Sequence, residues 1–357
     1  MKYLPSKADE KELRELIQTL REQIESIISK DTIKIVDVGS TAKGTWLPEE
    51  SDIDMYIFTN EPKEDFDKVS KVFADGHRKQ GQLLIWNFLL GKYDVDLIFA
   101  IPKHRKREDT TKHTAYFREH LTSKMCREVR KTKALFKTYG VYGADIGGII
   151  GVAIEELIVQ TGDLKNLCQI TQSIDKPWIQ DPTMTKPRNL LACIETKRWK
   201  QINELSKDYL AGKIKLRYDP MTLDRFGRNY PGYSTLYFRR KSDKHIDYLI
   251  SSSILAKAER ILKSKEREVT VESDIYLDDK LILFVFRVRP LELSETYEYC
   301  MDPVKGDAEA FKLAHPSTTE KVGLICATIR RGRTTYPETY FTFLIFSEME
   351  HRGYCRW

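Results

Sequence analysis

The sequence lacks the features that mark membrane proteins and secreted proteins. Its longest uninterrupted apolar run covers residues 281–286, whereas a membrane-spanning helix needs roughly 20 apolar residues. The N-terminus has no apolar core of the kind found in signal peptides. We therefore expect a soluble, cytoplasmic protein without a membrane partner.

Cysteine pairs, repeats and a strong charge excess are also missing. The six cysteines lie far apart and form no CxxC pair, which argues against a disulfide framework and a zinc site. The formal net charge is only +6, so the composition permits a polyanionic partner without requiring one. No internal repeat interrupts the 357 residues, a length that suits two or three packed domains.

The pattern that is present changes along the chain and predicts an α+β multidomain protein. An amphipathic helix followed by β-branched and aromatic runs predicts a small α/β unit over residues 1–105. Residues 106–215 are expected to be mostly helical, and residues 216–357 to form an α+β layer. Strands are expected at residues 33–38, 53–58, 83–90, 95–101, 233–239, 269–276, 281–288, 323–329 and 339–346. Later helices are expected at residues 113–139, 147–161, 189–213 and 246–264.

The most informative segment covers residues 38–58. A strand is expected to end before a Gly39-Ser40 turn, and the next strand to carry Asp52 and Asp54 on one face, because strand side chains alternate with period two. Two carboxylates so close repel each other, and a divalent cation between them relieves the repulsion. The turn can offer N–H groups and the Ser40 hydroxyl to phosphate oxygens, and Lys43 can add positive charge.

A third carboxylate, Asp96, is expected on a neighbouring strand about forty residues later. Three such acids can hold two metal ions roughly 3.5–4 Å apart, an arrangement that activates an attacking hydroxyl and stabilises a leaving pyrophosphate. Mg²⁺ suits carboxylate and phosphate oxygens. A lone Asp-x-Asp pattern is weak, since Asp is common at strand ends. The turn, the basic residue and the third acid together predict a metal site for phosphate chemistry.

These residues resemble the signature of the nucleotidyltransferase superfamily with a DNA polymerase beta-like core, a Gly-Ser turn followed by a two-acid strand. Later segments resemble, in order, motifs of the archaeal, class I CCA-adding tRNA nucleotidyltransferases. These segments are EDTTKHTAYF, EVRKTKALFKTYGVYGAD, GGIIGVAIEEL and DPTMTKPRN, followed by STLYFRRKSDKHIDYL and LILFVFRVRPLEL. The resemblance therefore spans nearly the whole chain.

The resemblance implies a polymerase-beta-like nucleotidyltransferase head, a helical middle domain and a shortened α+β C-terminal domain that binds tRNA. It implies template-independent addition of C, C and A to the 3′ end of tRNA from CTP and ATP, with Mg²⁺ as cofactor and the tRNA acceptor end as partner. A homodimer is left open. The residues implied in catalysis and metal binding are Asp52, Asp54 and Asp96. Those implied in nucleotide binding are Gly39, Ser40, Lys43, His113, Lys133, Tyr142 and Arg188.

The sequence departs from the family pattern at several positions. Lys43 stands where the family usually has Arg, and Asp52 where many members have Glu. The pattern Asp-Arg-Thr that usually precedes the histidine is Asp-Thr-Thr at residues 109–111, and the sequence ends at Trp357, before helices that usually complete the third domain. We expect activity to survive the first two changes because both keep the charge.

Contacts to RNA call for basic and aromatic residues in an extended groove. Two basic clusters follow expected strands in the last third of the chain. The candidate RNA-binding residues are Arg239, Arg240, Arg330, Arg331 and Arg333.

Several alternatives stay open at this point. The chain could make oligoadenylate or cyclic-dinucleotide signals, could add only part of the CCA end, or could be a non-catalytic RNA-binding protein, although the last would be expected to have lost its acids. Single residues also have plainer interpretations, since Tyr142 could be simple packing and Arg188 could merely pair with Asp181.

Overall fold

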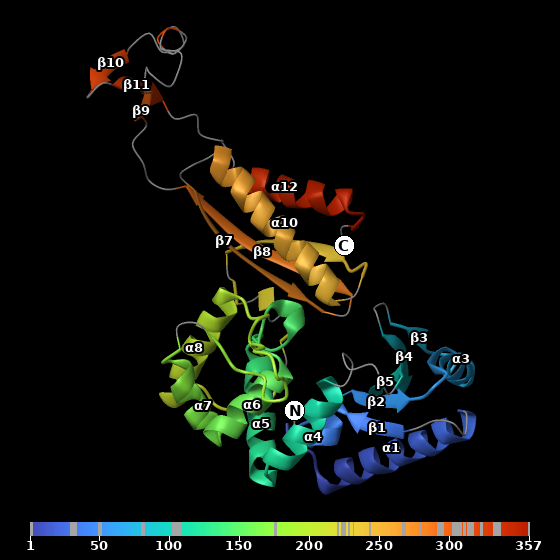
Figure 1. Ribbon diagram of the computed structural model, residues 1–357. Coiled ribbons are helices and arrows are strands. Elements are labelled where there is room, and N and C mark those ends of the chain that lie inside the picture. The colour runs from blue at the N-terminus through green and yellow to red at the C-terminus, as the bar shows by residue number, and fades with distance from the viewer. Residues whose placement is uncertain are drawn as a thin grey trace. The chain divides into compact units, whose positions relative to one another are not determined.

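The structure, a computed structural model, divides the chain into two compact units, Met1–Phe226 and Gly227–Trp357, whose elements are labelled in Figure 1. The predicted division into three domains stays a prediction. The residues that the structure describes are 3–28, 34–48, 52–79, 83–101, 109–174, 177–219, 221–222, 226–227, 229–230, 232–242, 244–265, 269–278, 280–290, 296–301, 309, 312, 318–321, 324–330 and 337–355.

A five-stranded sheet in the order β1-β2-β5-β4-β3 organises the start of the first unit. Strands β2 and β5 run parallel, and the other neighbours run antiparallel. Four of these strands confirm the predicted ones within a few residues. The strands are β1 (Lys34–Val38), β2 (Ile53–Phe58), β3 (His77–Arg78), β4 (Leu84–Leu90) and β5 (Tyr93–Ala100).

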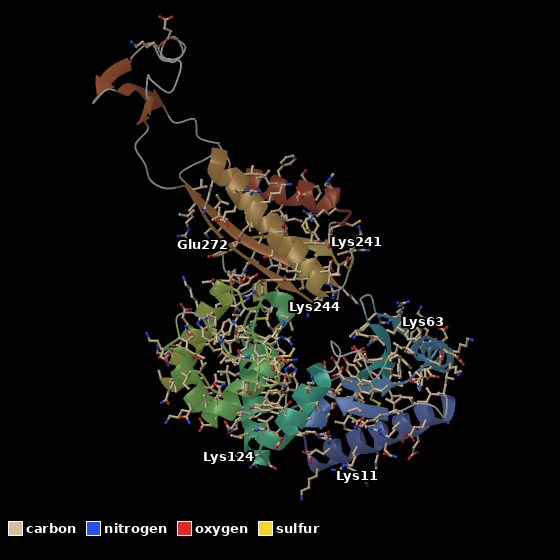
Figure 2. The ribbon with its side chains drawn as sticks, viewed as in Figure 1. Lys11, Lys63, Lys124, Lys241, Lys244 and Glu272 are labelled. Atoms are coloured by element: carbon tan, nitrogen blue, oxygen red, sulfur yellow. The ribbon has the colours of Figure 1, made fainter. Side chains whose placement is uncertain are left out.

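Two helices, α1 (Lys7–Ile27) and α3 (Pro62–Val72), cover one face of this sheet. Helix α1 is the predicted amphipathic helix, and it begins at a capping box in which Ser6 and Asp9 satisfy each other's backbone N–H groups. Its apolar stripe packs on the inward residues of β2 and β5. Polar residues such as Lys11 and Lys63 lie on the outer surface of the two helices (Figure 2).

The other face of the sheet carries a smaller apolar cluster, formed by Val38, Tyr56, Ile98 and Ala100. Residues directly opposite each other on paired strands point to the same face, so the register places Asp54 and Asp96 on this second face. The short helix α2 (Gly39–Lys43) follows β1 directly. The core under α1 and α3 thus lies on one face of the sheet, and Asp54 and Asp96 lie on the other.

A helical part completes the first unit and has its own core of apolar residues. The helix predicted at residues 113–139 is two helices, because the Thr122 side chain caps a new helix by accepting a hydrogen bond from the Met125 N–H group at 3.2 Å. Of the segment predicted at 189–213, only the later part is helical. The elements are α4 (Asp109–His120), α5 (Ser123–Thr138), η2 (Ala144–Ile146), α6 (Gly151–Thr161), α7 (Leu164–Thr171) and α8 (Thr196–Leu210).

The second unit is an α+β layer, as expected. Helices α10 (Lys244–Lys265) and α12 (Pro337–His351) pack on the antiparallel sheet β6-β8-β7, and a separate sheet has the order β10-β11-β9. The strands are β6 (Ser234–Arg239), β7 (Val269–Leu277), β8 (Leu281–Pro290), β9 (Thr296–Met301), β10 (Thr318–Lys321) and β11 (Leu324–Arg330). No helix of the described residues is long and apolar enough to cross a bilayer.

The strand predicted at residues 339–346 is wrong, because this segment belongs to helix α12. Its aromatic and β-branched composition favours a strand, but the buried residues Phe341, Ile345 and Met349 of α12 recur every fourth position. This spacing places them on one helix face. Packing against the sheet therefore overrides the local propensity.

Candidate active site

Two carboxylates lie directly opposite each other at the centre of the sheet. Asp54 is the second residue of β2, and Asp96 is its partner across the parallel pairing with β5. Both follow a residue that points into the core, Ile53 on β2 and Val95 on β5. The predicted meeting of acids from neighbouring strands on one face is therefore confirmed for this pair.

Gly39 lies against Asp54 so closely that no side chain fits between them. A Cβ atom at residue 39 would lie 2.0 Å from Asp54 Oδ2, and the backbone φ of Gly39 is +73°. Both the contact and the left-handed φ require glycine. The turn after β1 is thereby fitted to the carboxylate, which explains why a Gly-Ser turn accompanies the acids.

Asp52 precedes β2 rather than lying within it, and the residue as a whole is exposed although neighbouring groups partly shield its carboxyl. The surrounding protein desolvates its carboxyl, and Asp94 and Asp96 add negative charge, which together raise its pKa to about 6. Burial raises the pKa of Asp54 to about 7, with further contributions from Asp96 and Asp52. Burial and mutual repulsion therefore both disfavour the charged forms of these two carboxyls.

Two residues that the sequence analysis did not single out hold Asp96. Lys79 Nζ lies 2.7 Å from Asp96 Oδ2, and Asn87 Nδ2 donates to Asp96 Oδ1 at 2.8 Å and to Asp94 Oδ1 at 2.5 Å. Burial opposes the charge on Lys79, yet its bond to Asp96 raises its pKa above the ordinary value. Asn87 is directly opposite Asp96 in the antiparallel pairing of β4 and β5, so strand register is the signal that could have found it.

A cavity of about 190 Å³ lies beside these carboxylates and joins the sheet to the helical part. It is lined by residues from both sides of the site, so Lys133 and Tyr142 border the same space as Asp52 and Asp54. The lining residues are Ser40, Thr45, Trp46, Leu47, Asp52, Asp54, Lys133, Lys137 and Tyr142.

A buried ion-pair network fastens α2 to helices α5 and α6. The Glu155 carboxylate accepts a 2.5 Å bond from Lys43 Nζ and a 2.6 Å bond from Thr45 Oγ1. Lys133 Nζ lies 3.3 Å from the same carboxylate and donates to the Thr45 carbonyl oxygen at 3.1 Å. Burial lowers the pKa of Lys133 to about 8, although Glu155 opposes this shift. Burial works against the Glu155 charge too, but Lys43 and Lys133 lower the pKa of that carboxyl.

Of Lys43 and Tyr142, both of which were expected to bind the nucleotide, only Tyr142 lines the cavity. Lys43 was expected to contact phosphate, but its side chain is only 9% exposed, is paired with Glu155 and does not line the cavity. Tyr142 does line it, and the ammonium of Lys137 lies 4.9 Å from the centre of the Tyr142 ring. Such a contact holds a cation over an aromatic face, so Lys137 joins the candidate residues that sequence reasoning missed.

His113 and Arg188 converge on a buried carboxylate outside this cavity. His113 Nε2 lies 2.8 Å from Asp181 Oδ2, and Arg188 Nη1 lies 3.6 Å from the same atom. The Thr183 N–H group and hydroxyl also donate to Asp181, at 3.0 and 2.8 Å. The plainer interpretation of Arg188, a pair with Asp181, describes what the structure contains. The hydrogen bond between His113 and Asp181 connects helix α4 to the loop that precedes α8.

The predicted RNA-binding residues fall in three situations. Arg239 is exposed at the end of β6. The Arg240 guanidinium binds Asp247 at 3.2 Å and the Asp278 carbonyl oxygen at 2.9 Å, so it fastens elements within its own unit. Arg331 and Arg333 lie outside the described residues, as does the side chain of Arg330.

The donor types at the site fit a divalent cation. The carboxylates of Asp52, Asp54 and Asp96 are oxygen ligands of the kind that Mg²⁺ and Mn²⁺ take. Burial, and then the neighbouring carboxylates, raise the pKa of the first two, and a bound cation would favour their charged forms. The third carboxylate, Asp96, is paired with the ammonium group of Lys79, which neutralises its charge. In the described part of the chain, no three His, Cys, Asp or Glu side chains stand close enough together to hold an ion as they are.

Comparison with known proteins agrees with this geometry. Residues 17–133 match the nucleotidyltransferase domain family. The CCA-adding enzyme of Halobacterium salinarum is 29% identical over 195 residues, covering 50% of this chain and 43% of that enzyme. The CCA-adding enzyme of Pyrobaculum aerophilum is 31% identical over 179 residues, covering 44% of this chain and 42% of that enzyme. The matches thus span less than half the length of these relatives.

A longer match is found at lower identity. The CCA-adding enzyme of Sulfurisphaera tokodaii is 25% identical over 354 residues, covering 89% of this chain and 76% of that enzyme. Among solved structures, the Cid1 poly(U) polymerase covers 62% of this chain at 12% identity with a TM-score of 0.47, a likeness too weak to bear on function. Residues 17–133 therefore match the nucleotidyltransferase domain family, and most of the chain's length is similar to the CCA-adding enzyme of Sulfurisphaera tokodaii.

Proposed function

We propose that the protein adds C, C and A to the 3′ end of tRNA, using CTP and ATP, by nucleotidyl transfer. One observation carries the proposal. Asp54 and Asp96 lie opposite each other on parallel strands, and the Asp54 carboxylate lines a cavity that is also lined by two lysines, a tyrosine and a serine hydroxyl. This combination places metal-binding oxygens next to groups that bind phosphate.

In the proposed reaction, the 3′ hydroxyl oxygen of the RNA forms a bond to the α-phosphorus of the nucleoside triphosphate, and the bond from that phosphorus to the β-phosphate oxygen breaks. Pyrophosphate leaves, and the hydroxyl proton passes to solvent. Asp52, Asp54 and Asp96 would hold Mg²⁺, which when bound lowers the pKa of an attacking hydroxyl and stabilises a leaving pyrophosphate.

The chain's own residues would bind and orient the triphosphate. Lys133, Lys137 and Tyr142 line the cavity from the helical side, and Ser40 lines it from the sheet side, so cationic and hydroxyl donors face the carboxylates across it. Glu155 holds Lys133 in place through the buried network. His113 and Arg188 act in this scheme through the Asp181 loop rather than from the cavity.

The test is extension of three tRNA transcripts that end before CCA, after C and after CC. Purified protein and Mg²⁺ are incubated with each transcript and with CTP or ATP alone. We expect CTP to extend the first two transcripts and ATP to extend only the third. Extension by one nucleotide alone would restrict the activity to part of the CCA end.

The same reactions identify the main rival. A synthase of oligoadenylate or cyclic dinucleotides would form soluble nucleotide products in the absence of any tRNA. A protein that leaves all three transcripts unchanged, and that makes no soluble product, would overturn the proposal.

A further inference from the structure

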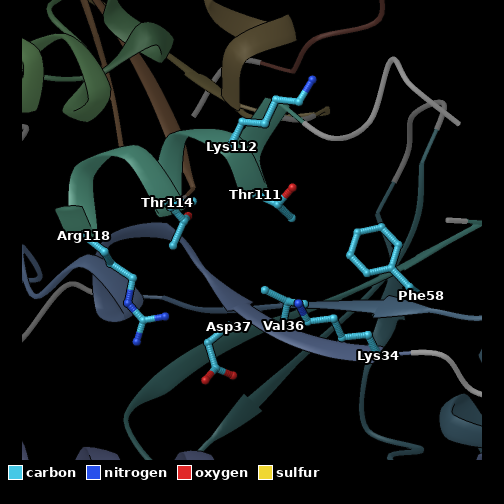
Figure 3. Close-up of a pocket in the computed structure, with 9 residues that line it drawn as sticks. Lys34, Val36, Asp37, Phe58, Thr111, Lys112, Thr114 and Arg118 are labelled. Carbon is cyan, nitrogen blue, oxygen red and sulfur yellow. The ribbon is translucent and has the colours of Figure 1, made fainter. Parts of the chain in front are cut away.

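A second and larger cavity, of about 410 Å³, lies between strand β1 and helix α4 and has no role in the reaction described above. Its helical wall is formed by residues at positions 111, 114, 115 and 118, which share one face of α4. Its sheet wall comes from β1 and from the end of β2 (Figure 3). The lining residues are Lys34, Val36, Asp37, Phe58, Thr111, Lys112, Thr114, Ala115 and Arg118.

This cavity lies on the same face of the sheet as the carboxylates. Lys34 is directly opposite Phe58, and Val38 directly opposite Asp54, in the antiparallel pairing of β1 and β2. Because strand residues alternate between faces, Lys34, Phe58 and Asp54 all point to one side. Phe58 lies four positions after Asp54, which corresponds to about 13 Å along the strand. A strand of RNA can cover that distance with a few nucleotides.

Among the described residues that line the cavity, positive charges outnumber negative ones. Lys34 and Arg118 are exposed, and neither makes an ion pair with another described residue. The acid at the rim, Asp37, is already paired with Arg21 at 2.7 Å. In Figure 3 the side chains of Arg118 and Lys34 reach toward the same space, whereas Lys112 points away from it.

The floor of the cavity is apolar. Val36 and Phe58 contribute to it, and Phe58 stacks on Tyr56 with ring centroids 5.6 Å apart, which holds its ring in place. Aromatic side chains beside cations form the usual binding surface for single-stranded nucleic acid, because bases stack on the ring while phosphates meet the charges. A triphosphate alone would leave the apolar floor unused.

We propose that this cavity binds the sugar-phosphate backbone and a base of the RNA substrate, at a short distance from its reacting end. The proposal rests on the proposed function, since it takes RNA as the acceptor. Lys34 and Arg118 are binding residues for phosphate, and Phe58 offers a stacking surface.

The test compares two double variants that remove the same charge. Lys34→Gln/Arg118→Gln neutralises the cavity, and Lys63→Gln/Lys124→Gln neutralises two exposed lysines elsewhere on the first unit (Figure 2). Affinity for a tRNA transcript ending before CCA is measured by fluorescence anisotropy over a series of salt concentrations. For the cavity variant we expect roughly tenfold weaker binding, and a slope of log Kd against log salt that is smaller by about one to two. The control should bind like the wild-type protein.

A second variant tests the same cavity without removing a cation. Ala115→Glu places a carboxylate on its exposed rim, and we expect it to weaken binding of the transcript as well. CTP affinity, measured by calorimetry, should change by less than about twofold in every variant. Thermal melting verifies that each variant is folded.

The outcomes separate this proposal from the proposed function. If the wild-type protein extends the transcript but all variants bind it alike, the cavity proposal is overturned and the function stands. Equal losses of CTP and RNA affinity would also overturn it, because the cavity would then hold the triphosphate. A wild-type protein that neither binds nor extends the transcript would overturn both.

Discussion

At the scale of single residues, the site depends on contacts that fix the carboxylates before any ligand binds. Gly39 leaves just enough space for Asp54, and Asn87 donates to both Asp94 and Asp96. The sequence predicted the glycine and the acids, because a motif and period-two alternation mark them. It did not predict Asn87 or Lys79, because their roles depend on which strands become neighbours.

The first prediction concerns Gly39→Ala. The added methyl group would lie 2.0 Å from Asp54 Oδ2 and would strain a φ of +73°, so Asp54 must move. A displacement of this size should lower the rate of nucleotide addition about a hundredfold or more. Gly91→Ala is the matched control, since its φ is +62° but no atom lies within 4 Å of the added Cβ. It should lose only about 1 kcal/mol of stability and keep its activity; equal rates in the two variants would contradict the account.

The second prediction concerns Lys133 and pH. Its pKa, which burial lowers to about 8, means that the ammonium is protonated below that pH and neutral above it. If Lys133 contacts the triphosphate, CTP affinity without added metal should fall as the pH rises from about 7 to about 9. Calorimetric titration at both pH values measures this. Lys133→Met should show weaker binding and a flatter pH profile, and a wild-type profile that is flat or rises with pH would remove Lys133 from the binding site.

At the scale of elements, the site is assembled from the five-stranded sheet and from helices α2, α5 and α6, which the buried ion pairs of Glu155 connect. Strand ends and the helix predicted at residues 113–139 follow from hydrophobic spacing, although Thr122 divides that helix in two. The Glu155 network could not be predicted, because it joins residues 22 to 112 positions apart in the chain. The pair of His113 and Asp181 could not be predicted either, because these residues are 68 positions apart in the chain. Tertiary packing alone brings these groups together.

The third prediction compares two adjacent glutamates of α6. Glu155→Gln removes the charge that neutralises Lys43 and Lys133, and breaking a buried pair in this way costs roughly 3–5 kcal/mol of stability. Glu156→Gln is the control, because burial raises the pKa of its carboxyl and its bond to Gln160 tolerates an amide acceptor. We expect it to cost less than about 1 kcal/mol. Urea unfolding measures the free energy of unfolding of both variants. Similar losses of stability in the two would show that the ion pairs of Glu155 contribute little.

At the scale of the whole molecule, the α+β character and the order of its parts were predicted from changing hydrophobic patterns. The chain divides into two compact units, and its division into three domains stays a prediction. The residues of the proposed active site lie in the first unit, and the second contains two sheets, helices and a core of its own. Segment 339–346 shows where composition misleads, since its burial every fourth residue decides for a helix.

The fourth prediction follows from this division. Units with separate cores should unfold in separable steps, and CTP should stabilise only the unit that binds it. At a concentration about a hundred times its Kd, CTP should raise the melting temperature of one transition by about 5–10 °C. Differential scanning calorimetry with and without CTP measures the shift, and an equal shift of every transition would contradict independent units.

The most direct measurement of the central claim is the rate of CMP transfer to a tRNA transcript ending before CCA, in the wild-type protein, Asp96→Ala and Asp94→Ala. Both aspartates accept a bond from Asn87, but only Asp96 lies opposite Asp54. We predict that Asp96→Ala lowers the rate roughly a thousandfold with transcript affinity unchanged, and that Asp94→Ala stays within about tenfold of wild type. An Asp96→Ala protein that transfers CMP at the wild-type rate would contradict the account.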